Sequence, residues 1–174
     1  MAVLRSRSQA GTLAILLLAA AVLLACVTAP AAAQEAPICK QRSKTYTGKD
    51  DRLNLGKGND KVNGGDGNDV IKGGPGNDIL NGGKGNDKVF GGPGNDVVCG
   101  GLDNDKVYGD EGKDELYGEE QDDKLYGGDG IDRLFGGEAP DFLSGGAGVD
   151  VCDGGNPNKG DRADDSCETS PNVP

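Results

Sequence analysis

The chain has 174 residues with a formal net charge of -11, and it contains 32 glycines, no histidine and no tryptophan. Without histidine, this chain holds no Ser/His/Asp or Cys/His nucleophile system and no zinc site of the metalloprotease type. Its acidic balance argues against a nucleic-acid partner, because phosphate backbones are bound by clustered Lys and Arg. Glycine does not recur at every third residue, which excludes collagen. A repeat architecture, a disordered chain and a metal-dependent fold remain.

The N-terminal segment, residues 1–33, has the layout of a secretory signal peptide. Arg5 and Arg7 precede an apolar run over residues 13–25, and three alanines at 31–33 form a small-residue cleavage site. The run is shorter than the roughly 20 apolar residues of a membrane span, so we expect no transmembrane segment in the mature chain. A competing interpretation is a bacterial lipoprotein box in which Cys26 is lipidated. Both interpretations predict a protein outside the cytoplasm, extracellular or at the cell surface.

The middle of the chain repeats one motif every nine residues. Glycine recurs without a break at positions 64, 73, 82, 91, 100, 109, 118, 127, 136, 145 and 154. Aspartate recurs in the same way at 51, 60, 69, 78, 87, 96, 105, 114, 123, 132, 141 and 150. An aliphatic residue stands two residues after each of these aspartates, until Cys152 takes its place. A disordered acidic linker would not hold three residue classes in one register.

A single unit, residues 73–81, indicates the local structure. Glycines allow positive φ and close backbone approach, so its first six residues predict a tight turn. Its last three residues alternate like a short strand, with Leu80 pointing inward and Ile79 and Asn81 outward. Each unit then forms half a coil, and eighteen residues return the chain to the same edge. The prediction is an all-β fold of two parallel sheets around a thin aliphatic core.

That core is too thin to fold a glycine-rich chain alone, because ordering the backbone costs much conformational entropy and each unit buries one aliphatic side chain. Stacking also brings Asp60, Asp78 and Asp96 along one edge, roughly 5 Å apart, where their charges repel. A bound dication removes this repulsion. Oxygen ligands without Cys or His favour calcium, whose coordination shell also accepts backbone carbonyls.

The pattern Gly-Gly-x-Gly-x-Asp-x-aliphatic-x resembles the repeat of the RTX (repeats-in-toxin) calcium-binding β-roll over about residues 46–155. The resemblance implies a parallel β-roll, a right-handed two-sheet solenoid that folds on binding several Ca²⁺ ions. Each ion would lie between turns eighteen residues apart, held by Asp side chains and by carbonyls of the glycine-rich turns. The metal-binding residues so implied are Asp60, Asp69, Asp78, Asp87, Asp96, Asp132 and Asp150, with Gly65, Gly67, Gly74, Gly76, Gly83, Gly85, Gly92 and Gly94.

The units match this pattern unevenly. Turn glycines are replaced by Asp103, Asp110, Glu119, Gln121 and Ala139. We therefore expect the best sites to use the pairs Asp60/Asp78, Asp78/Asp96, Asp69/Asp87 and Asp132/Asp150. Sites that use Asp105, Asp114, Asp123 or Asp141 are expected to be weaker or absent. An alternative remains open, in which the aspartates only stabilise their own turns through local hydrogen bonds.

Secretion would permit disulfides, and four cysteines follow the signal peptide. Of their three possible pairings, their positions in the repeat favour Cys39–Cys99 and Cys152–Cys167. Cys99 is expected to point outward, whereas Cys152 takes an inward position. The chain then divides into a signal peptide (1–33), an N-terminal cap (34–47), the roll (48–155) and a disulfide-closed C-terminal cap and tail (156–174).

Aromatic residues gather at the outward ninth position of the units. Phe90, Tyr108 and Tyr126 are predicted to share one face, which also carries Lys88, Lys106 and Lys124. Tyr117 and Phe135 are predicted to lie on the opposite face. One interpretation is a cross-strand ladder that stiffens the sheet. The other is a flat aromatic and basic strip that binds a polysaccharide or a cell-surface protein.

The sequence thus predicts a secreted calcium-binding β-roll that serves as a structural or surface-interaction module and is not an enzyme. The alternative is a secreted carbohydrate- or ice-binding protein that uses the aromatic and lysine strip. RTX repeats often accompany a catalytic domain and leave the cell through a C-terminal signal. Here the repeats and caps account for the chain after residue 33, and the N-terminal signal suggests the general secretory route of a bacterium.

Overall fold

The computed structural model describes residues 44–46, 48–155 and 160–169. Every regular element in these ranges is a β-strand. Consequently, no helix in this part of the chain is long and apolar enough to cross a membrane. The predicted signal peptide, Cys26, Cys39 and nearly all of the predicted N-terminal cap lie outside the described residues.

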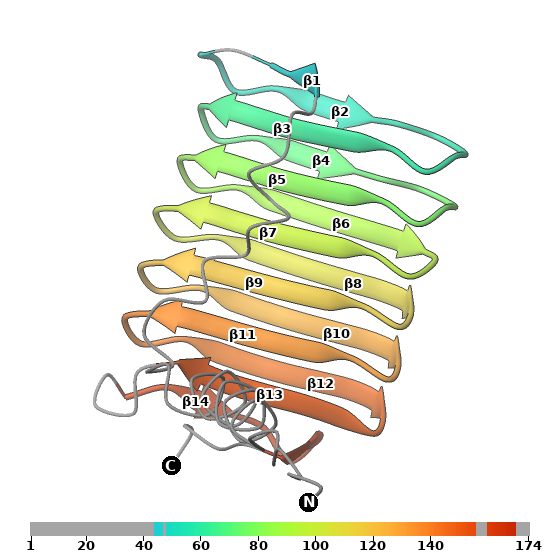
Figure 1. Ribbon diagram of the computed structural model, residues 1–174. Coiled ribbons are helices and arrows are strands. Elements are labelled where there is room, and N and C mark those ends of the chain that lie inside the picture. Colours follow the sequence, from blue (N-terminus) through green and yellow to red (C-terminus); the bar gives the residue numbers. More distant parts are fainter. Residues whose placement is uncertain (1–43, 47, 156–159, 170–174) are drawn as a thin grey trace, which may run out of the picture. The chain divides into compact units, whose positions relative to one another are not determined.

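The strands form two parallel sheets. Figure 1 shows the strands of each sheet following one another along one axis. The odd-numbered strands form sheet A: β1 (Lys44–Thr45), β3 (Lys61–Asp66), β5 (Ile79–Lys84), β7 (Val97–Leu102), β9 (Glu115–Glu120), β11 (Arg133–Glu138), β13 (Asp150–Gly155) and β15 (Cys167–Thr169). The even-numbered strands form sheet B: β2 (Arg52–Asn54), β4 (Val70–Lys72), β6 (Lys88–Pro93), β8 (Lys106–Gly112), β10 (Lys124–Gly130), β12 (Phe142–Gly148) and β14 (Arg162–Ala163).

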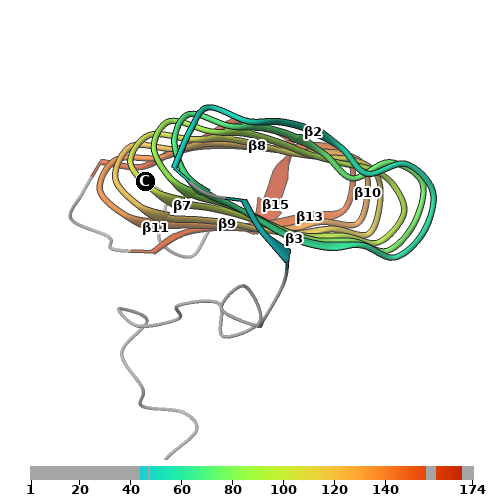
Figure 2. The ribbon, with the colours of Figure 1, turned by 90° about the horizontal axis from the view of Figure 1, so that it is seen from above.

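The strand register follows the eighteen-residue rule. Leu80 of β5 pairs with Val62 of β3 and with Val98 of β7, each eighteen residues away. The chain alternates between the sheets, so that successive coils superpose as closed loops in the view along the axis (Figure 2). The predicted all-β fold, a two-sheet parallel solenoid, is confirmed. At the C-terminal end the spacing changes, because Phe142 pairs with Arg162.

The core consists of one side chain from each strand between β3 and β13, the residue two positions after a repeated aspartate. Its members are between 0 and 5% exposed: Val62, Ile71, Leu80, Val89, Val98, Val107, Leu116, Leu125, Leu134, Leu143 and Cys152. Leu53 packs against the N-terminal end of this cluster and is partly buried. The inward positions are therefore the predicted ones, and the core is a single row of side chains between two sheets.

Neighbouring coils approach most closely at the turns, and glycine is required there. The φ angle of Gly76 is 154°. A Cβ atom built on this residue would lie 1.7 Å from the carbonyl oxygen of Gly58, in the preceding coil. Any side chain here would push the two coils apart. All eight glycines named as candidate ligand residues have φ between 102° and 154°.

In the part of the chain that the structure describes, five residues other than glycine also adopt positive φ, between 74° and 82°: Asp103, Asp110, Glu119, Gln121 and Ala139. They are the five residues named above that replace turn glycines. The turns therefore keep their backbone path without their glycines, at a cost on the order of 1 kcal/mol for each left-handed residue.

We expect Ala139→Gly to raise the free energy of unfolding by about 1 kcal/mol, because glycine adopts the left-handed conformation without steric strain. Chemical denaturation of the calcium-loaded protein measures this change. Ala147→Gly is the matched control, since Ala147 is exposed near the end of β12 and its φ is not positive. The control should lose stability slightly. A gain of equal size in both variants would contradict the explanation.

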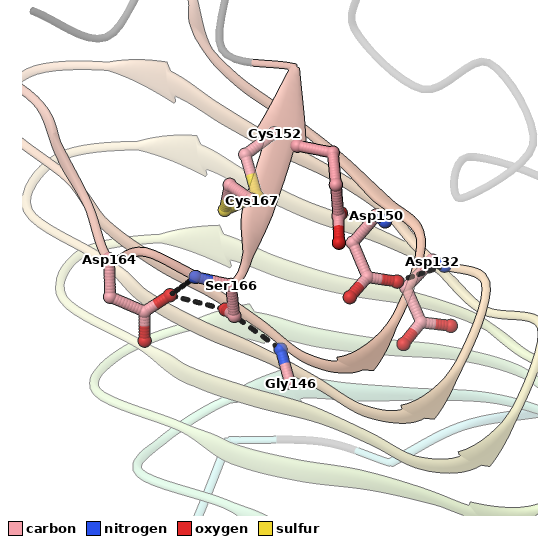
Figure 3. Close-up of a disulfide and its surroundings, with 8 residues drawn as sticks. Asp132, Gly146, Asp150, Cys152, Asp164, Ser166 and Cys167 are labelled. Atoms are coloured by element: carbon pink, nitrogen blue, oxygen red, sulfur yellow. Dashed lines mark hydrogen bonds between the residues drawn. A yellow bond between two sulfur atoms is a disulfide. The ribbon is translucent and has the colours of Figure 1, made fainter.

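The predicted disulfide between Cys152 and Cys167 is present, with a Cα–Cα distance of 5.7 Å (Figure 3). Cys152 lies in the core, so this bond fixes β15 to the last complete coil. Beside it, the hydroxyl oxygen of Ser166 accepts a hydrogen bond of 2.9 Å from the backbone N–H of Gly146. The C-terminal segment thereby covers the end of the roll.

Cys99 lies apart from the main core. It is fully buried and packs with Val97 and Tyr117 on the outer side of sheet A, as expected for an outward position. Cys99 is disulfide-bonded. Because Cys39 lies outside the described residues, its pairing with Cys99 stays a prediction.

Candidate metal centre

The repeated aspartates line the inside of the turns on both edges of the roll. From Asp69 to Asp150 they are between 0 and 3% exposed. Each Oδ1 atom accepts a hydrogen bond from the backbone N–H of the aspartate one coil earlier: Asp69 N–H donates to Asp87, for example, at 2.6 Å. Bonds of 2.6 to 2.8 Å join the successive pairs from Asp51/Asp69 to Asp132/Asp150. These bonds reach the neighbouring coil, which the local-turn alternative does not require.

The second carboxylate oxygen of each aspartate, Oδ2, is buried and has no hydrogen-bond partner. This holds for Asp60, Asp69, Asp78, Asp87, Asp96, Asp105, Asp114, Asp123, Asp132, Asp141, Asp150 and Asp161. All four pairs expected to form the best sites are included. The aspartates of the irregular turns have the same arrangement, so their lower affinity for calcium remains a prediction. A row of buried, partnerless carboxylate oxygens is unfavourable unless another group compensates it.

At most turns, Oδ2 faces the first glycine of its own turn and a carbonyl of the next coil. A Cβ atom built on Gly64 would lie 2.2 Å from Oδ2 of Asp69 and 2.4 Å from the carbonyl oxygen of Gly82. At Gly73 the same two distances, to Asp78 and Gly91, are 2.2 and 2.5 Å. Two oxygens thus converge at a point where only glycine leaves space. A carbonyl has two lone pairs, so it can bind a cation while accepting a backbone hydrogen bond.

Burial raises the pKa of these carboxyl groups above the ordinary value of 3.8. The pKa is raised to about 7 for Asp87, about 8 for Asp105 and about 9 for Asp123. Desolvation is the largest cause, and repulsion from neighbouring carboxylates adds to it, whereas the backbone N–H bond to Oδ1 opposes it. The pKa is also raised for Asp69, Asp78, Asp132, Asp150 and Asp161. At neutral pH the charged ladder therefore opposes folding unless a cation binds.

The donor set fits calcium. Within residues 44–46, 48–155 and 160–169, no three His, Cys, Asp or Glu side chains lie close enough together to hold a metal ion. An ion between two coils must therefore bind turn carbonyls as well as aspartates. Ca²⁺ takes six to eight oxygen ligands in flexible geometry, whereas Mg²⁺ requires a near-ideal octahedron and retains its waters. Soft metals would need sulfur ligands.

Two acidic residues at the C-terminal end continue the ladders and were missed from the sequence. Oδ1 of Asp161 accepts a hydrogen bond of 2.9 Å from the N–H of Asp141. A side-chain oxygen of Glu168 accepts one from the N–H of Asp150. Glu168 follows Asp150 by eighteen residues, so the spacing rule could have found it. Asp161 is displaced by two residues from the regular position, and strict periodicity hides it.

A second ladder runs along the exposed rim of the turns, formed by the residue before each aspartate. Oδ1 of Asn59 accepts a hydrogen bond of 2.9 Å from the N–H of Asn77, one coil later. The other acceptors are Asp50, Asn68, Asn77, Asn86, Asn95 and Asn104. The asparagine period was visible in the sequence, but its role was not predicted. This ladder satisfies its own donors, so we place the ion sites inside the turns.

The candidate partner strip lies on the outer face of sheet B. Phe90, Tyr108 and Tyr126 are in register, and their rings stack with centroids 4.6 and 5.0 Å apart. Lys88, Lys106 and Lys124 are in register in the same three strands. Tyr117 and Phe135 stack 5.0 Å apart on sheet A, the opposite face. The grouping by faces is the predicted one, and the stacked rings form a cross-strand ladder.

Comparison with known proteins identifies one family. No curated protein and no solved structure matches the chain. The model of the RTX calcium-binding nonapeptide repeat matches four times, at residues 46–80, 72–107, 100–134 and 126–156. These matches cover the whole regular part of the roll and more than half of the chain. The protein therefore belongs to the RTX calcium-binding nonapeptide repeat family.

Proposed function

We propose that this protein is a secreted structural or surface-interaction module that binds several calcium ions between its coils and folds on doing so. One observation carries the proposal. At most turns a buried Oδ2 atom without a hydrogen-bond partner converges with a carbonyl oxygen of the next coil. Membership of a calcium-binding repeat family supports calcium as the ion.

Two features support an extracellular or cell-surface location. The predicted signal peptide over residues 1–33 directs the chain to export. The Cys152–Cys167 disulfide suits an oxidising compartment. Calcium is plentiful outside cells, so the chain would stay loose during export and condense after it. Lipidation at Cys26 would instead hold the same roll at the cell surface.

A catalytic role is not part of the proposal. The carboxylates that lie close together are enclosed in the turns, where backbone N–H groups of neighbouring coils already bind their Oδ1 atoms. Such groups are positioned to hold ions rather than to meet a substrate. The chain also lacks the histidine that most often serves in general acid–base catalysis.

The test compares two substitutions in one turn by calorimetric titration with calcium and magnesium. Asp69→Asn should weaken at least one calcium site tenfold or more, because it replaces the inward Oδ2 with an amide group. In chelator, however, this variant should fold at least as well as the wild type, because the new amide can donate a hydrogen bond to the Gly82 carbonyl. Asp66→Asn is the control: Asp66 is exposed and pairs with Lys84 at 3.7 Å. Equal calcium affinity in both variants, or equal binding of magnesium and calcium, would refute the proposal.

A further inference from the structure

The outer face of sheet B is basic, although the protein as a whole is acidic. From β2 to β12, the outward strand positions beside the buried row hold Arg52, Lys72, Lys88, Lys106 and Lys124, and neither Asp nor Glu. The equivalent positions of sheet A hold both signs, for example Glu115 and Arg133, which pair at 3.6 Å. The fold thus concentrates positive charge on one face of a chain with a net charge of -11.

Three of these lysines form a column. Lys88, Lys106 and Lys124 are exposed and directly in register on β6, β8 and β10, so successive side chains start about 4.8 Å apart. None of the three forms an ion pair with any residue that the structure describes, whereas Lys84 and Arg133 do. Like charges at this spacing repel one another. An unpaired column of this kind is complementary to a partner with negative charges at the same spacing.

The aromatic ladder beside the lysine column offers no free ring face on which a partner could stack. Phe90 and Tyr108 stack with an interplanar angle of 6°, and Tyr108 and Tyr126 with 8°. The ammonium of Lys72 lies 5.6 Å from the Phe90 ring centroid, over its free face. The ring faces are therefore used within the ladder, and a sugar ring cannot stack flat on them. Recognition on this face must come from the lysines, which argues against a neutral polysaccharide.

The basic face is narrow, which restricts the classes of partner that can bind to it. Its two outward columns stand two residues apart on each strand, roughly 7 Å. Acidic turn residues flank them, such as Asp110 and Glu111 on one side and Asp103 and Asp122 on the other. A nucleic-acid duplex would press its phosphates against these acidic rims. An extended acidic peptide presents same-side carboxylates roughly 7 Å apart, which does not match the lysine spacing.

We propose that the outer face of sheet B binds a linear acidic polysaccharide that lies along the axis of the roll. An extended polyuronate carries one carboxylate per sugar unit, and every second carboxylate projects to the same side. Two sugar units are about as long as two strand spacings of the sheet. Carboxylates on the same side of the chain would thereby meet Lys88 and Lys124, with Lys106 between them. The polysaccharide would be a second ligand of the calcium-loaded roll. The inference rests on the proposed function only because the roll must be folded for the lysines to line up.

The experiment measures binding of fluorescent oligogalacturonate to the calcium-loaded full chain by anisotropy, at low salt and constant calcium. Changing Lys88, Lys106 and Lys124 together to Gln should weaken binding tenfold or more, because all three charges face the ligand. The matched control changes three exposed lysines that lie outside the column, Lys57, Lys84 and Lys113, to Gln and should alter affinity less than twofold. Binding should also fall steeply with added salt.

Three further ligands and one further variant make the test decisive. Dextran, polyglutamate and oligothymidylate should each bind at least tenfold more weakly than oligogalacturonate, and an equal affinity for any of them overturns the proposal. Changing the three column lysines to Arg keeps the charges and should preserve binding. Loss of binding in that variant, or an equal loss in the control that changes Lys57, Lys84 and Lys113, also overturns it. A wild-type chain that binds calcium but no oligogalacturonate refutes this inference and leaves the calcium function standing.

Discussion

Removing calcium from the folded protein at neutral pH should abolish most of its β-sheet signal in far-ultraviolet circular dichroism. The physical reason is the set of side chains that each coil buries. A coil buries two core side chains and also two carboxylates whose Oδ2 atoms have no protein partner. Without a cation, the charged carboxylates oppose the small gain from apolar burial. Added calcium should restore the signal cooperatively, because each coil packs only on its neighbours.

The control for this experiment is magnesium at the same concentration, which should restore little of the signal because it keeps its own water shell. The disulfides should be kept oxidised, so that the unfolded chain retains its cross-links throughout. If the signal persists unchanged in chelator, the core and the disulfides hold the fold by themselves. Calcium would then be an accessory ligand, and the account of the buried aspartates would be wrong.

Acidification should replace calcium in part. In chelator, the β-sheet signal should rise as the pH falls from about 8 to about 5. The folded-state pKa values are raised, to about 6 for Asp96, about 7 for Asp114 and about 9 for Asp123, so the folded state binds more protons than the unfolded state in this range. Stability therefore increases as the pH falls and is lost again as the pH rises through the folded pKa values. Below about pH 4 the gain ends, because the unfolded carboxyls then bind protons too.

The pH dependence can be assigned to the buried carboxyls by substitution. Asp87, Asp105 and Asp123 have raised pKa values and lie on one edge, and changing all three to Asn should remove much of the pH dependence in chelator. Asp66→Asn, in an exposed position, should leave it unchanged. With saturating calcium the dependence should reverse, because protons compete with the ion for the same oxygens. A chelated protein that loses β structure on acidification would contradict this explanation.

The periodic parts of the fold and of the candidate site could be predicted from the sequence. One nine-residue period fixes the coil length, the two sheets and the inward direction of residues such as Leu80. It also places the charged column and the aromatic ladder, because residues eighteen apart must pair in parallel strands. Because the sequence is periodic, contacts between residues far apart in the chain can be predicted from their spacing alone.

The conformation of the irregular turns could not be predicted from the period. Replacing a turn glycine suggests a damaged turn, yet Asp103 and Glu119 adopt the left-handed conformation that glycine would have. The backbone register of the coils on both sides imposes this path, so the regular repeats determine the conformation of the irregular ones. A rule that judges each turn by its own residues misses this cooperativity.

Other features depend on the direction in which side chains bond, which no spacing reveals. The aspartates bond to the preceding coil, and the asparagines accept from the following one. Both ladders have the same period, and the shape of the turn makes the position of the aspartates buried and that of the asparagines exposed. Asp161 was hidden for a simpler reason, since two extra residues break the count just before it.

The bonds of Asp161 and Glu168 also define where the stack of coils ends. Because every aspartate N–H needs an acceptor from the next coil, a stack of identical coils would always end on an unfinished layer, open to one-dimensional growth. The C-terminal segment supplies the last two acceptors, to Asp141 and Asp150. It also places short strands at this end of both sheets, fixed by the disulfide. A second molecule therefore meets a completed boundary rather than a template, and a repeating sequence acquires a defined size.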